Sequence, residues 1–334
     1  MRIAIAGLGA AALRGHLPAL EALASEGKVT IVGGCDPDQQ RCLVAGRAYP
    51  QIPMFASAQE MLASIDSGLL VIAANPGVHA ELAALGAAHG QHILCEKPAG
   101  STESHVDTFA AIRRRYPDRG LVAMYQYRFS RAWIMAVRFL QEAAKSQASF
   151  VMSVDVQRPV VDRHAVSNWR EDPSMGGALA DHAVHFLALA RALRGPLDVV
   201  SSEREYDVYR QEHAKASLRV GMDTLDVSVD YGACERSTSI SLACGEVALR
   251  WRDDALSLER RGQEGHSLRV PALADRRHID ALYFPMYRNV LAGLKHSGWR
   301  RRRAQELLEV GYGLNALLAV ARPRESRQIV ALAA

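Results

Sequence analysis

The amino terminus combines a short apolar strand, a glycine-rich turn and an amphipathic helix in immediate succession. Apolar residues fill 3–6, the turn Gly7-Leu8-Gly9-Ala10-Ala11-Ala12 follows, and leucines at helical spacing occupy 11–25. In a G-x-G-x-x-A turn, Gly7 permits the tight bend, Gly9 lets the backbone approach a phosphate, and Ala12 allows close packing of helix on strand. The following helix then presents free N–H groups to an anionic ligand. This opening favours a parallel α/β fold that binds a dinucleotide.

The first third of the chain continues the same alternation. Further apolar strands are expected at 29–34, 69–73, 92–94 and 121–124, and helices at 38–48, 78–89 and 102–115, with a short connection near 55–62. Continuous apolar strands that alternate with helices indicate a parallel sheet covered on both faces. We predict a Rossmann dinucleotide-binding domain over 1–124.

The alternation of single strands with helices ends near residue 125. We expect helices at 131–145 and 177–194, a strand at 150–157, successive strands through 198–270, helices at 280–295 and 302–321, and a last strand at 328–332. Strand after strand with Gly and Asp turns is typical of an antiparallel sheet. The fold class is therefore α/β, and 125–334 forms a substrate-binding and oligomerisation domain with a large, mostly antiparallel open sheet.

Composition excludes several classes of protein. The chain has 334 residues, 49% hydrophobic and 23% charged, with a formal net charge of +4. These values suit two globular domains and do not suggest a nucleic-acid partner. Five widely spaced cysteines argue against a disulfide framework or a zinc site. No apolar run reaches membrane-spanning length and no signal peptide precedes the first strand, so we expect a cytoplasmic protein without a membrane partner. We expect the basic run 300–303 to be a solvated turn.

An acidic residue follows the second strand. Asp36 is placed to accept hydrogen bonds from the adenosine ribose and to repel the 2′-phosphate of NADP, which favours NAD(H). Arg41 lies close enough in sequence to keep NADP(H) open. The alternative is an aspartate that caps the next helix. Asn75 and His79, in the turn after strand 69–73, are further candidates for cofactor binding, although a plain turn explains Asn75 equally well.

The tetrapeptide Cys95-Glu96-Lys97-Pro98 carries the strongest chemical signal. Lys97 follows an apolar strand at the carboxyl edge of the predicted sheet, where open α/β sheets bind ligands. Pro98 restricts the backbone beside it. A catalytic lysine and a lysine in a surface turn are both compatible with this sequence. Glu96 is a candidate for cofactor binding.

A second group of candidates lies in 176–185. Asp181 and His185 are four residues apart on a predicted helix and share one face. A histidine exchanges protons near neutral pH, and a neighbouring carboxylate orients it. An ordinary helical Asp–His pair is the alternative. A zinc site with His182 is disfavoured because no third strong ligand is evident.

Together these segments resemble the glucose–fructose oxidoreductase and inositol dehydrogenase family, Gfo/Idh/MocA. The likeness rests on these segments in order: the glycine turn, His16-Leu17-Pro18-Ala19-Leu20, Glu96-Lys97-Pro98, Tyr127-Arg128-Phe129, Trp169-Arg170, Asp172-Pro173, Gly176-Gly177 and Asp181-x-x-x-His185. It implies a catalytic set of Lys97, Asp181 and His185, and oligomer contacts through an open sheet. Ala183 and Ala188 depart from the family pattern, where a glycine and a second aspartate are frequent.

The resulting hypothesis is an NAD(P)-dependent oxidoreductase acting on a hydroxyl or ketone of a sugar, cyclitol or related small molecule. Candidate substrate contacts are Gln126, Tyr127, Arg128, Trp169, Arg170 and His182. Two alternatives stay open. One is an imine- or bilin-type reductase, or a redox-neutral NAD-using enzyme, on the same fold. The other is a non-catalytic NAD-binding regulator.

Overall fold

The structure is a computed structural model that describes residues 1–145, 149–159, 176–194, 198–206, 212–220, 222–260, 263–273, 275–320 and 322–324. The chain forms two compact units. The first contains residues 1–130 and 276–312, and the second contains 131–275 with the described residues from 313 onward. The sequence division after residue 124 placed 276–312 with the second domain, whereas these residues pack with the first unit.

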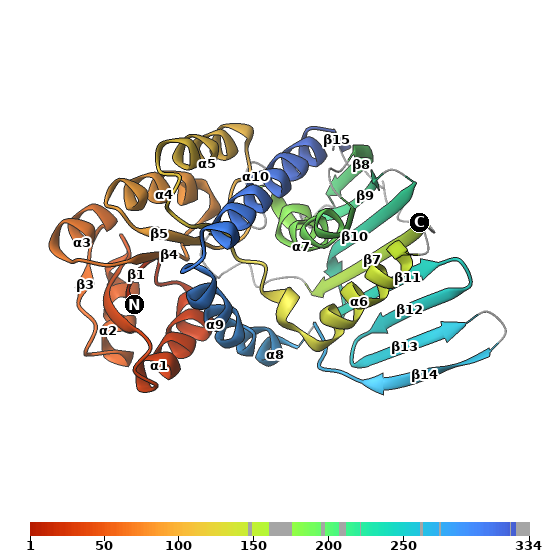
Figure 1. Ribbon diagram of the computed structural model, residues 1–334, viewed down its shortest axis with the longest axis horizontal. Coiled ribbons are helices and arrows are strands. Elements are labelled where there is room, and N and C mark those ends of the chain that lie inside the picture. Colours follow the sequence, from red (N-terminus) through yellow and green to blue (C-terminus); the bar gives the residue numbers. More distant parts are fainter. Residues whose placement is uncertain are drawn as a thin grey trace, which may run out of the picture. The chain divides into compact units, whose positions relative to one another are not determined.

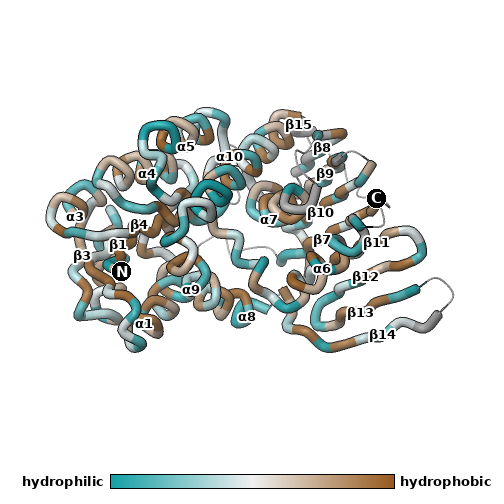
Figure 2. The backbone as a smooth tube through the Cα atoms, in the orientation of Figure 1, coloured by the Kyte–Doolittle hydropathy of each residue, from teal (hydrophilic) through white to brown (hydrophobic). Residues whose placement is uncertain are grey.

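The first unit is built on a parallel sheet of six strands in the order β3-β2-β1-β4-β5-β6. The strands are β1 (Arg2–Ala6), β2 (Thr30–Cys35), β3 (Met54–Phe55), β4 (Leu69–Ile72), β5 (His92–Cys95) and β6 (Leu121–Ala123). Every strand pair in this sheet is parallel. Figure 2 shows hydrophobic residues along its central strands, and β4 is buried over its whole length. The predicted parallel α/β domain is confirmed.

Helices flank this sheet (Figure 1). They are the π-helix η1 (Ala12–His16), α1 (Leu17–Ser25), α2 (Gln39–Ala48), α3 (Ala58–Ser64), the 3-10 helices η2 (Pro76–Val78) and η3 (Gln126–Phe129), α4 (His79–Ala88), α5 (Glu103–Arg115), α8 (Arg276–Ala281), α9 (Tyr283–Gly293) and α10 (Ser297–Val320). The range 55–62 is more than a connection, because α3 begins there with Ser57 Oγ accepting the N–H of Glu60 at 3.1 Å.

The first predicted helix, 11–25, is divided into η1 and α1. Leu17 N–H bonds to the carbonyl of Ala12, five residues back, and Pro18 follows with no N–H of its own. A proline interrupts the regular i→i−4 ladder, which accounts for the wide turn at this point.

The packing of α9 explains why 276–312 joins the first unit. Tyr283, Met286, Tyr287 and Val290 are all at most 5% exposed and lie in one hydrophobic cluster with residues of β1 and α1 such as Leu17. Burial of side chains of this size contributes about 1.5–3 kcal/mol each.

The basic run 300–303, which was expected to be a solvated turn, lies within α10, where Arg303 pairs with Glu306 one turn later. Arginine is a good helix former, and i,i+3 pairs support a helix.

The second unit is built on a sheet of nine strands in the order β14-β13-β12-β11-β7-β10-β9-β8-β15. The strands are β7 (Phe150–Pro159), β8 (Asp198–Tyr206), β9 (Glu212–Val220), β10 (Asp223–Ala233), β11 (Ser237–Cys244), β12 (Val247–Arg252), β13 (Ala255–Arg260), β14 (Gln263–Arg269) and β15 (Arg322–Arg324). The pairs β7–β10 and β8–β15 are parallel and the others are antiparallel. A large, mostly antiparallel sheet is confirmed. The strand expected at 328–332 lies outside the described residues.

Two helices, α6 (Arg131–Lys145) and α7 (Gly177–Arg194), pack on this sheet. Burial alternates along β7 and β10, so one face of each strand points to the helices and the other does not. Across the described ranges, no helix is both long enough and apolar enough to cross a bilayer.

Candidate active site

The glycine turn has the geometry that a bound pyrophosphate requires. Gly7 has a φ of +95°, and a Cβ at this position would lie 2.6 Å from the backbone of Ala73 and Ala74. Only glycine fits both conditions. A Cβ on Gly9 would meet nothing within 4 Å, so the backbone there borders open space. Ala12, in contrast, is completely buried. The turn therefore fits a dinucleotide at Gly9, with Gly7 and Ala12 holding the turn against the sheet.

Asp36 lies at the end of β2 with its carboxylate fixed toward this turn. Its Oδ2 accepts the N–H of Leu8 at 2.8 Å, and its Oδ1 accepts the N–H of Asp38 at 2.9 Å. The N-cap of α2 is Asp38, whose Oδ1 accepts the N–H of Gln40 at 2.9 Å. Asp36 is thus not the helix cap. Each carboxylate oxygen of Asp36 retains acceptor capacity for ribose hydroxyls.

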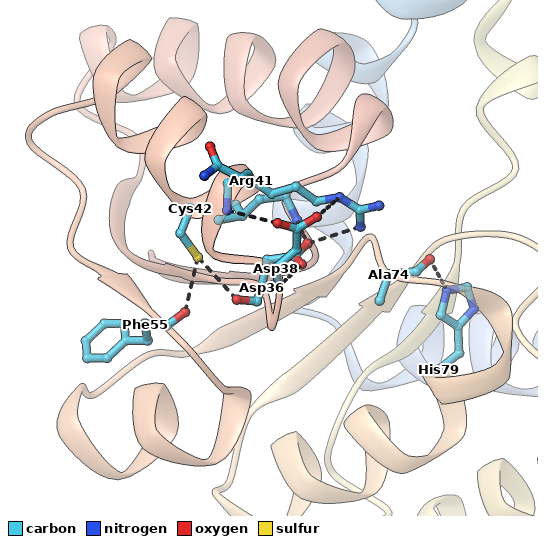
Figure 3. Close-up of polar contacts among 9 residues, drawn as sticks. Asp36, Asp38, Arg41, Cys42, Phe55, Ala74 and His79 are labelled. Atoms are coloured by element: carbon cyan, nitrogen blue, oxygen red, sulfur yellow. Dashed lines mark hydrogen bonds and ion pairs between the residues drawn. The ribbon is translucent and has the colours of Figure 1, made fainter. Parts of the chain in front are cut away.

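Arg41 lies beside both aspartates (Figure 3). Its Nη1 is 3.6 Å from Asp36 Oδ2, and its Nε is 3.5 Å from Asp38 Oδ2. The side chain is 46% exposed. The positive charge of this guanidinium partly offsets the repulsion between Asp36 and a 2′-phosphate, so both NAD(H) and NADP(H) are compatible with the site. Cys42 completes the group with its Sγ 3.2 Å from the carbonyl oxygen of Asp36.

The two candidates after β4 have structural partners. Asn75 caps η2, with its Oδ1 accepting the N–H of Gly77 at 3.0 Å. His79 is completely buried, with Nδ1 2.9 Å from the carbonyl oxygen of Pro98 and Nε2 3.0 Å from that of Ala74. Burial lowers the pKa of His79, so the neutral ring donates to one of these carbonyls. His79 therefore lies between the loops after β4 and β5 and donates to one of them; Figure 3 marks its contact with Ala74.

Lys97 follows β5 and is half-buried, with a cis peptide bond to Pro98. Its N–H donates to Oε2 of Glu96 at 3.0 Å. Glu96 is 6% exposed, and its Oε1 accepts the hydroxyl of Tyr283 at 2.7 Å and lies 3.3 Å from His16 Nε2. Both oxygens of the Glu96 carboxylate therefore bond to the protein itself. His16 belongs to the motif quoted above, but no local pattern indicated Tyr283.

Three candidate substrate residues follow β6. Gln126 and Tyr127 are buried in η3, and no described residue bonds to Oε1 of Gln126. Arg128 Nη2 donates to Glu306 Oε1 at 2.9 Å and Nη1 to Oε2 at 3.3 Å. Its guanidinium also lies 5.3 Å from the ring of Tyr125. Arg128 thus joins η3 to α10 through a carboxylate that the sequence did not reveal.

The second unit holds Asp181, His182 and His185 on α7, each at most 5% exposed. The hydroxyl of Tyr231 on β10 donates to Asp181 Oδ2 at 2.7 Å. His182 Nε2 lies 3.5 Å from the same oxygen, and its ring stands edge-on to Tyr231 at 5.9 Å. Sequence reasoning paired Asp181 with His185 and missed Tyr231, which is 50 residues away. Trp169 and Arg170 lie outside the described residues.

Within the described ranges, no three His, Cys, Asp or Glu side chains are grouped so that they could hold a metal ion.

The strand order, the glycine turn and the acid after β2 define a dinucleotide-binding Rossmann fold. Residues 1–125 match the sequence profile of the GFO_IDH_MocA family, described as "Oxidoreductase family, NAD-binding Rossmann fold". Within these residues the chain matches the NAD-binding domain of the Gfo/Idh/MocA oxidoreductases.

Two curated relatives illustrate the likeness. Levoglucosan dehydrogenase of Pseudarthrobacter phenanthrenivorans is 30% identical over 142 residues, which cover 41% of this chain and 35% of that protein. The uncharacterized oxidoreductase C115.03 of Schizosaccharomyces pombe is 26% identical over 183 residues, which cover 54% of this chain and 48% of that protein. The chain thus spans less than half the length of each.

Solved structures match over nearly the whole chain. The 3-ketoreductase KijD10 from Actinomadura kijaniata, in complex with NADP and TDP-benzene, has a TM-score of 0.80 at 16% identity, covering 98% of this chain and 99% of that one. The WlbA dehydrogenase from Bordetella pertussis, in complex with NADH and UDP-GlcNAcA, has a TM-score of 0.76 at 19% identity, covering 96% and 95%. At these identities the likeness shows a shared fold.

Proposed function

We propose that this protein is an NAD(P)-dependent oxidoreductase that transfers hydride between nicotinamide and a hydroxyl or ketone carbon of a sugar, cyclitol or related small molecule. The observation that carries the proposal is the position of Lys97. It follows β5 at the same sheet edge at which Gly7, Gly9 and Asp36 form the dinucleotide turn. Ligands of open α/β sheets bind at this edge.

The nicotinamide supplies the hydride chemistry when it is bound. Gly9 receives the pyrophosphate in the turn that Gly7 and Ala12 hold against the sheet, and Asp36 receives the ribose. We favour NAD(H) because the Asp36 carboxylate repels a 2′-phosphate, while the exposed guanidinium of Arg41 keeps NADP(H) possible.

The catalytic set is Lys97, Asp181 and His185. The Lys97 ammonium donates to the substrate oxygen and stabilises negative charge as it develops there. His185 exchanges the hydroxyl proton as general base or general acid. Asp181 accepts the hydroxyl of Tyr231, and its carboxylate orients a neighbouring imidazole and offsets positive charge on it.

The substrate class rests on the relatives. One relative is named levoglucosan dehydrogenase, KijD10 is named a 3-ketoreductase, and the WlbA dehydrogenase was solved in complex with UDP-GlcNAcA. We propose Gln126, Tyr127, Arg128, Trp169, Arg170 and His182 as substrate contacts. Ala188, which is 3% exposed on α7, has no group to bind a hydroxyl, and this change favours a substrate with fewer hydroxyls than inositol.

We also propose a homo-oligomer formed through the face of the second sheet that points away from α6 and α7. This face carries small polar side chains such as Ser153, Ser217, Ser228, Ser239 and Ser241, around a hollow of about 740 Å³. Light scattering coupled to size exclusion measures the mass of the particle in solution. A mass of one chain at micromolar concentration would refute this part of the proposal.

The experiment that tests the function follows the absorbance of the reduced nicotinamide with a panel of sugars, cyclitols, keto-sugars and sugar nucleotides. Each is offered with NAD⁺, NADP⁺ and their reduced forms. We expect turnover with at least one pair. Tight NADH binding with no absorbance change, while substrate is consumed, would instead favour the redox-neutral enzyme. Binding without any consumption would favour the regulator.

A further inference from the structure

A cluster of four buried polar side chains lies behind the end of β5. We call His16, Glu96, Tyr283 and Tyr287 the Glu96 cluster. Each of them is at most 6% exposed. Tyr287 Oη lies 2.6 Å from His16 Nδ1, His16 Nε2 lies 3.3 Å from Glu96 Oε1, and the Tyr283 hydroxyl donates to the same oxygen at 2.7 Å. Buried polar groups require such partners, and here they form one connected network.

The donors of this network point toward Glu96. Where Nε2 of His16 carries a proton, the ring donates to Glu96, and the Tyr287 hydroxyl lies against the other ring nitrogen. Burial raises the pKa of Glu96, but the hydrogen bond and charge of His16, the charge of Lys97 and the hydrogen bond of Tyr283 outweigh it and lower this pKa to about 2. The cluster therefore closes around an ionised carboxylate.

The tyrosines remain neutral donors in this arrangement. Burial, followed by the charge of Glu96, raises the pKa of both Tyr283 and Tyr287 well above the ordinary value. Their rings stand edge-on to His16 at centroid distances of 4.8 and 5.9 Å. Gly15 makes room for this packing, because a Cβ there would lie 2.6 Å from Tyr283 Cε2.

The second oxygen of Glu96 connects the cluster to Lys97. Oε2 accepts the N–H of Lys97 at 3.0 Å, and the N–H of Glu96 itself donates to the carbonyl of Ile72 in β4 at 2.8 Å. Residues of α9 and η1 thus contact Oε1 of the carboxylate, and its Oε2 accepts the main-chain N–H of Lys97. A shift of Glu96 moves the residue on which the proposed chemistry depends.

We propose that Tyr283 and His16 are positioning residues that act on Lys97 through the Glu96 carboxylate. The inference rests on the proposed function of Lys97. It gives Glu96 a different role from the cofactor contact expected from sequence, because both of its oxygens face protein donors. It also assigns a part in catalysis to α9, a helix whose Tyr283 is 187 residues from Glu96 in the chain.

Two substitutions test this role. Tyr283→Phe deletes one hydroxyl and keeps the ring. Glu96→Gln keeps the shape, but its amide NH₂ must face either the Lys97 N–H or the donors of the cluster, so one bond is lost in either orientation. Tyr312→Phe is the matched control, since Tyr312 is exposed and bonds to Asp107 outside the cluster.

We expect kcat to fall about 10-fold in Tyr283→Phe and about 100-fold in Glu96→Gln, because small displacements of a catalytic group have effects of this size. KM and the NADH dissociation constant stay within about two-fold, since neither group contacts the cofactor. In Tyr283→Phe the acid limb of the kcat–pH profile moves to higher pH, because Glu96 has lost a donor that lowers its pKa. Tyr312→Phe behaves as wild type.

Other outcomes distinguish the positioning role of the Glu96 cluster from the proposed catalytic role of Lys97. A lower melting temperature with unchanged kcat and pH profile would show a purely structural cluster and overturn the inference. A rise in the NADH dissociation constant that matches the loss of kcat in Glu96→Gln would restore the cofactor contact and overturn it as well. If Lys97→Ala is inactive while both variants are normal, the inference fails and the proposed function stands. If Lys97→Ala is fully active, the proposed function itself fails.

Discussion

Gly7 and Gly9 permit a matched pair of substitutions that separates folding from cofactor binding. In Gly7→Ala the new Cβ meets the backbone of Ala73 and Ala74 at 2.6 Å, and the residue keeps a φ of +95°. The unfavourable φ costs about 1–2 kcal/mol. Overpacking adds about 1–3 kcal/mol. The total of about 2–5 kcal/mol lowers the melting temperature of a unit of this size by roughly 5–15 °C.

Gly9→Ala is expected to behave in the opposite way. Its Cβ meets nothing within 4 Å, so the melting temperature stays within about 1–2 °C of wild type. The methyl group instead occupies the space in which the pyrophosphate approaches the backbone, and the NADH dissociation constant rises about 10-fold or more, equal to about 1.4 kcal/mol.

The assays are thermal unfolding followed by circular dichroism and NADH titration followed by fluorescence. Both are read on the same preparations at one pH. The reasoning is refuted if Gly7→Ala melts with the wild type, or if Gly9→Ala binds NADH as tightly as the wild type does.

Three further predictions concern charged groups in the first unit. Asp36→Ser removes the repulsion of a 2′-phosphate next to Arg41, so the ratio of kcat/KM for NADP to that for NAD rises about 10-fold or more; an unchanged ratio would remove Asp36 from cofactor selection. Glu306→Ala removes the carboxylate that pairs with Arg128 and lowers the free energy of unfolding in urea by about 2–4 kcal/mol. This loss is smaller than for a fully buried pair because Arg128 is partly exposed. Arg128→Met in the same background should recover part of it. Glu96, whose pKa is about 2 in the folded protein, contributes stability that is fully present above about pH 4.5 and is lost as the pH falls toward 2; Glu96→Gln should flatten that part of a pH–stability curve, and an equally steep curve would place the acid sensitivity elsewhere.

Local sequence pattern predicted five strands of the first sheet and the dinucleotide turn, whereas the two-residue strand β3 was not predicted. The central strands β4 and β5 are almost completely buried, so each is a short apolar run between helical segments. The helix α3 was missed although Ser57 and Glu60 have the spacing of a capping box, because the segment is short and lies beside a two-residue strand.

Long-range contacts were not predictable from the same patterns. The sequence places Asp36, Lys97 and Asp181 in their elements, but it does not show which side chain meets each carboxylate. Tyr283 reaches Glu96, and Tyr231 reaches Asp181, from elements far along the chain. Periodicity describes the face that a residue occupies on its own element and contains no information on the partner across the core.

The position of 276–312 illustrates the same limit. These helices have ordinary amphipathic spacing, and their place after the antiparallel strands suggested the second domain. The apolar face of α9 instead packs with β1 and α1 in the first unit. An amphipathic helix fits many apolar surfaces of similar size, and the choice depends on side-chain shape, here the room that Gly15 leaves for Tyr283.

The central claim is that Lys97 performs chemistry at a bound dinucleotide. Single-turnover absorbance measurements on Lys97→Ala, with a substrate found in the panel and a parallel NADH titration, test it most directly. We predict that the rate of the nicotinamide absorbance change falls by about 100-fold or more while the NADH dissociation constant stays within about two-fold. A normal rate in Lys97→Ala, or a loss of NADH binding equal to the loss of rate, would contradict the account.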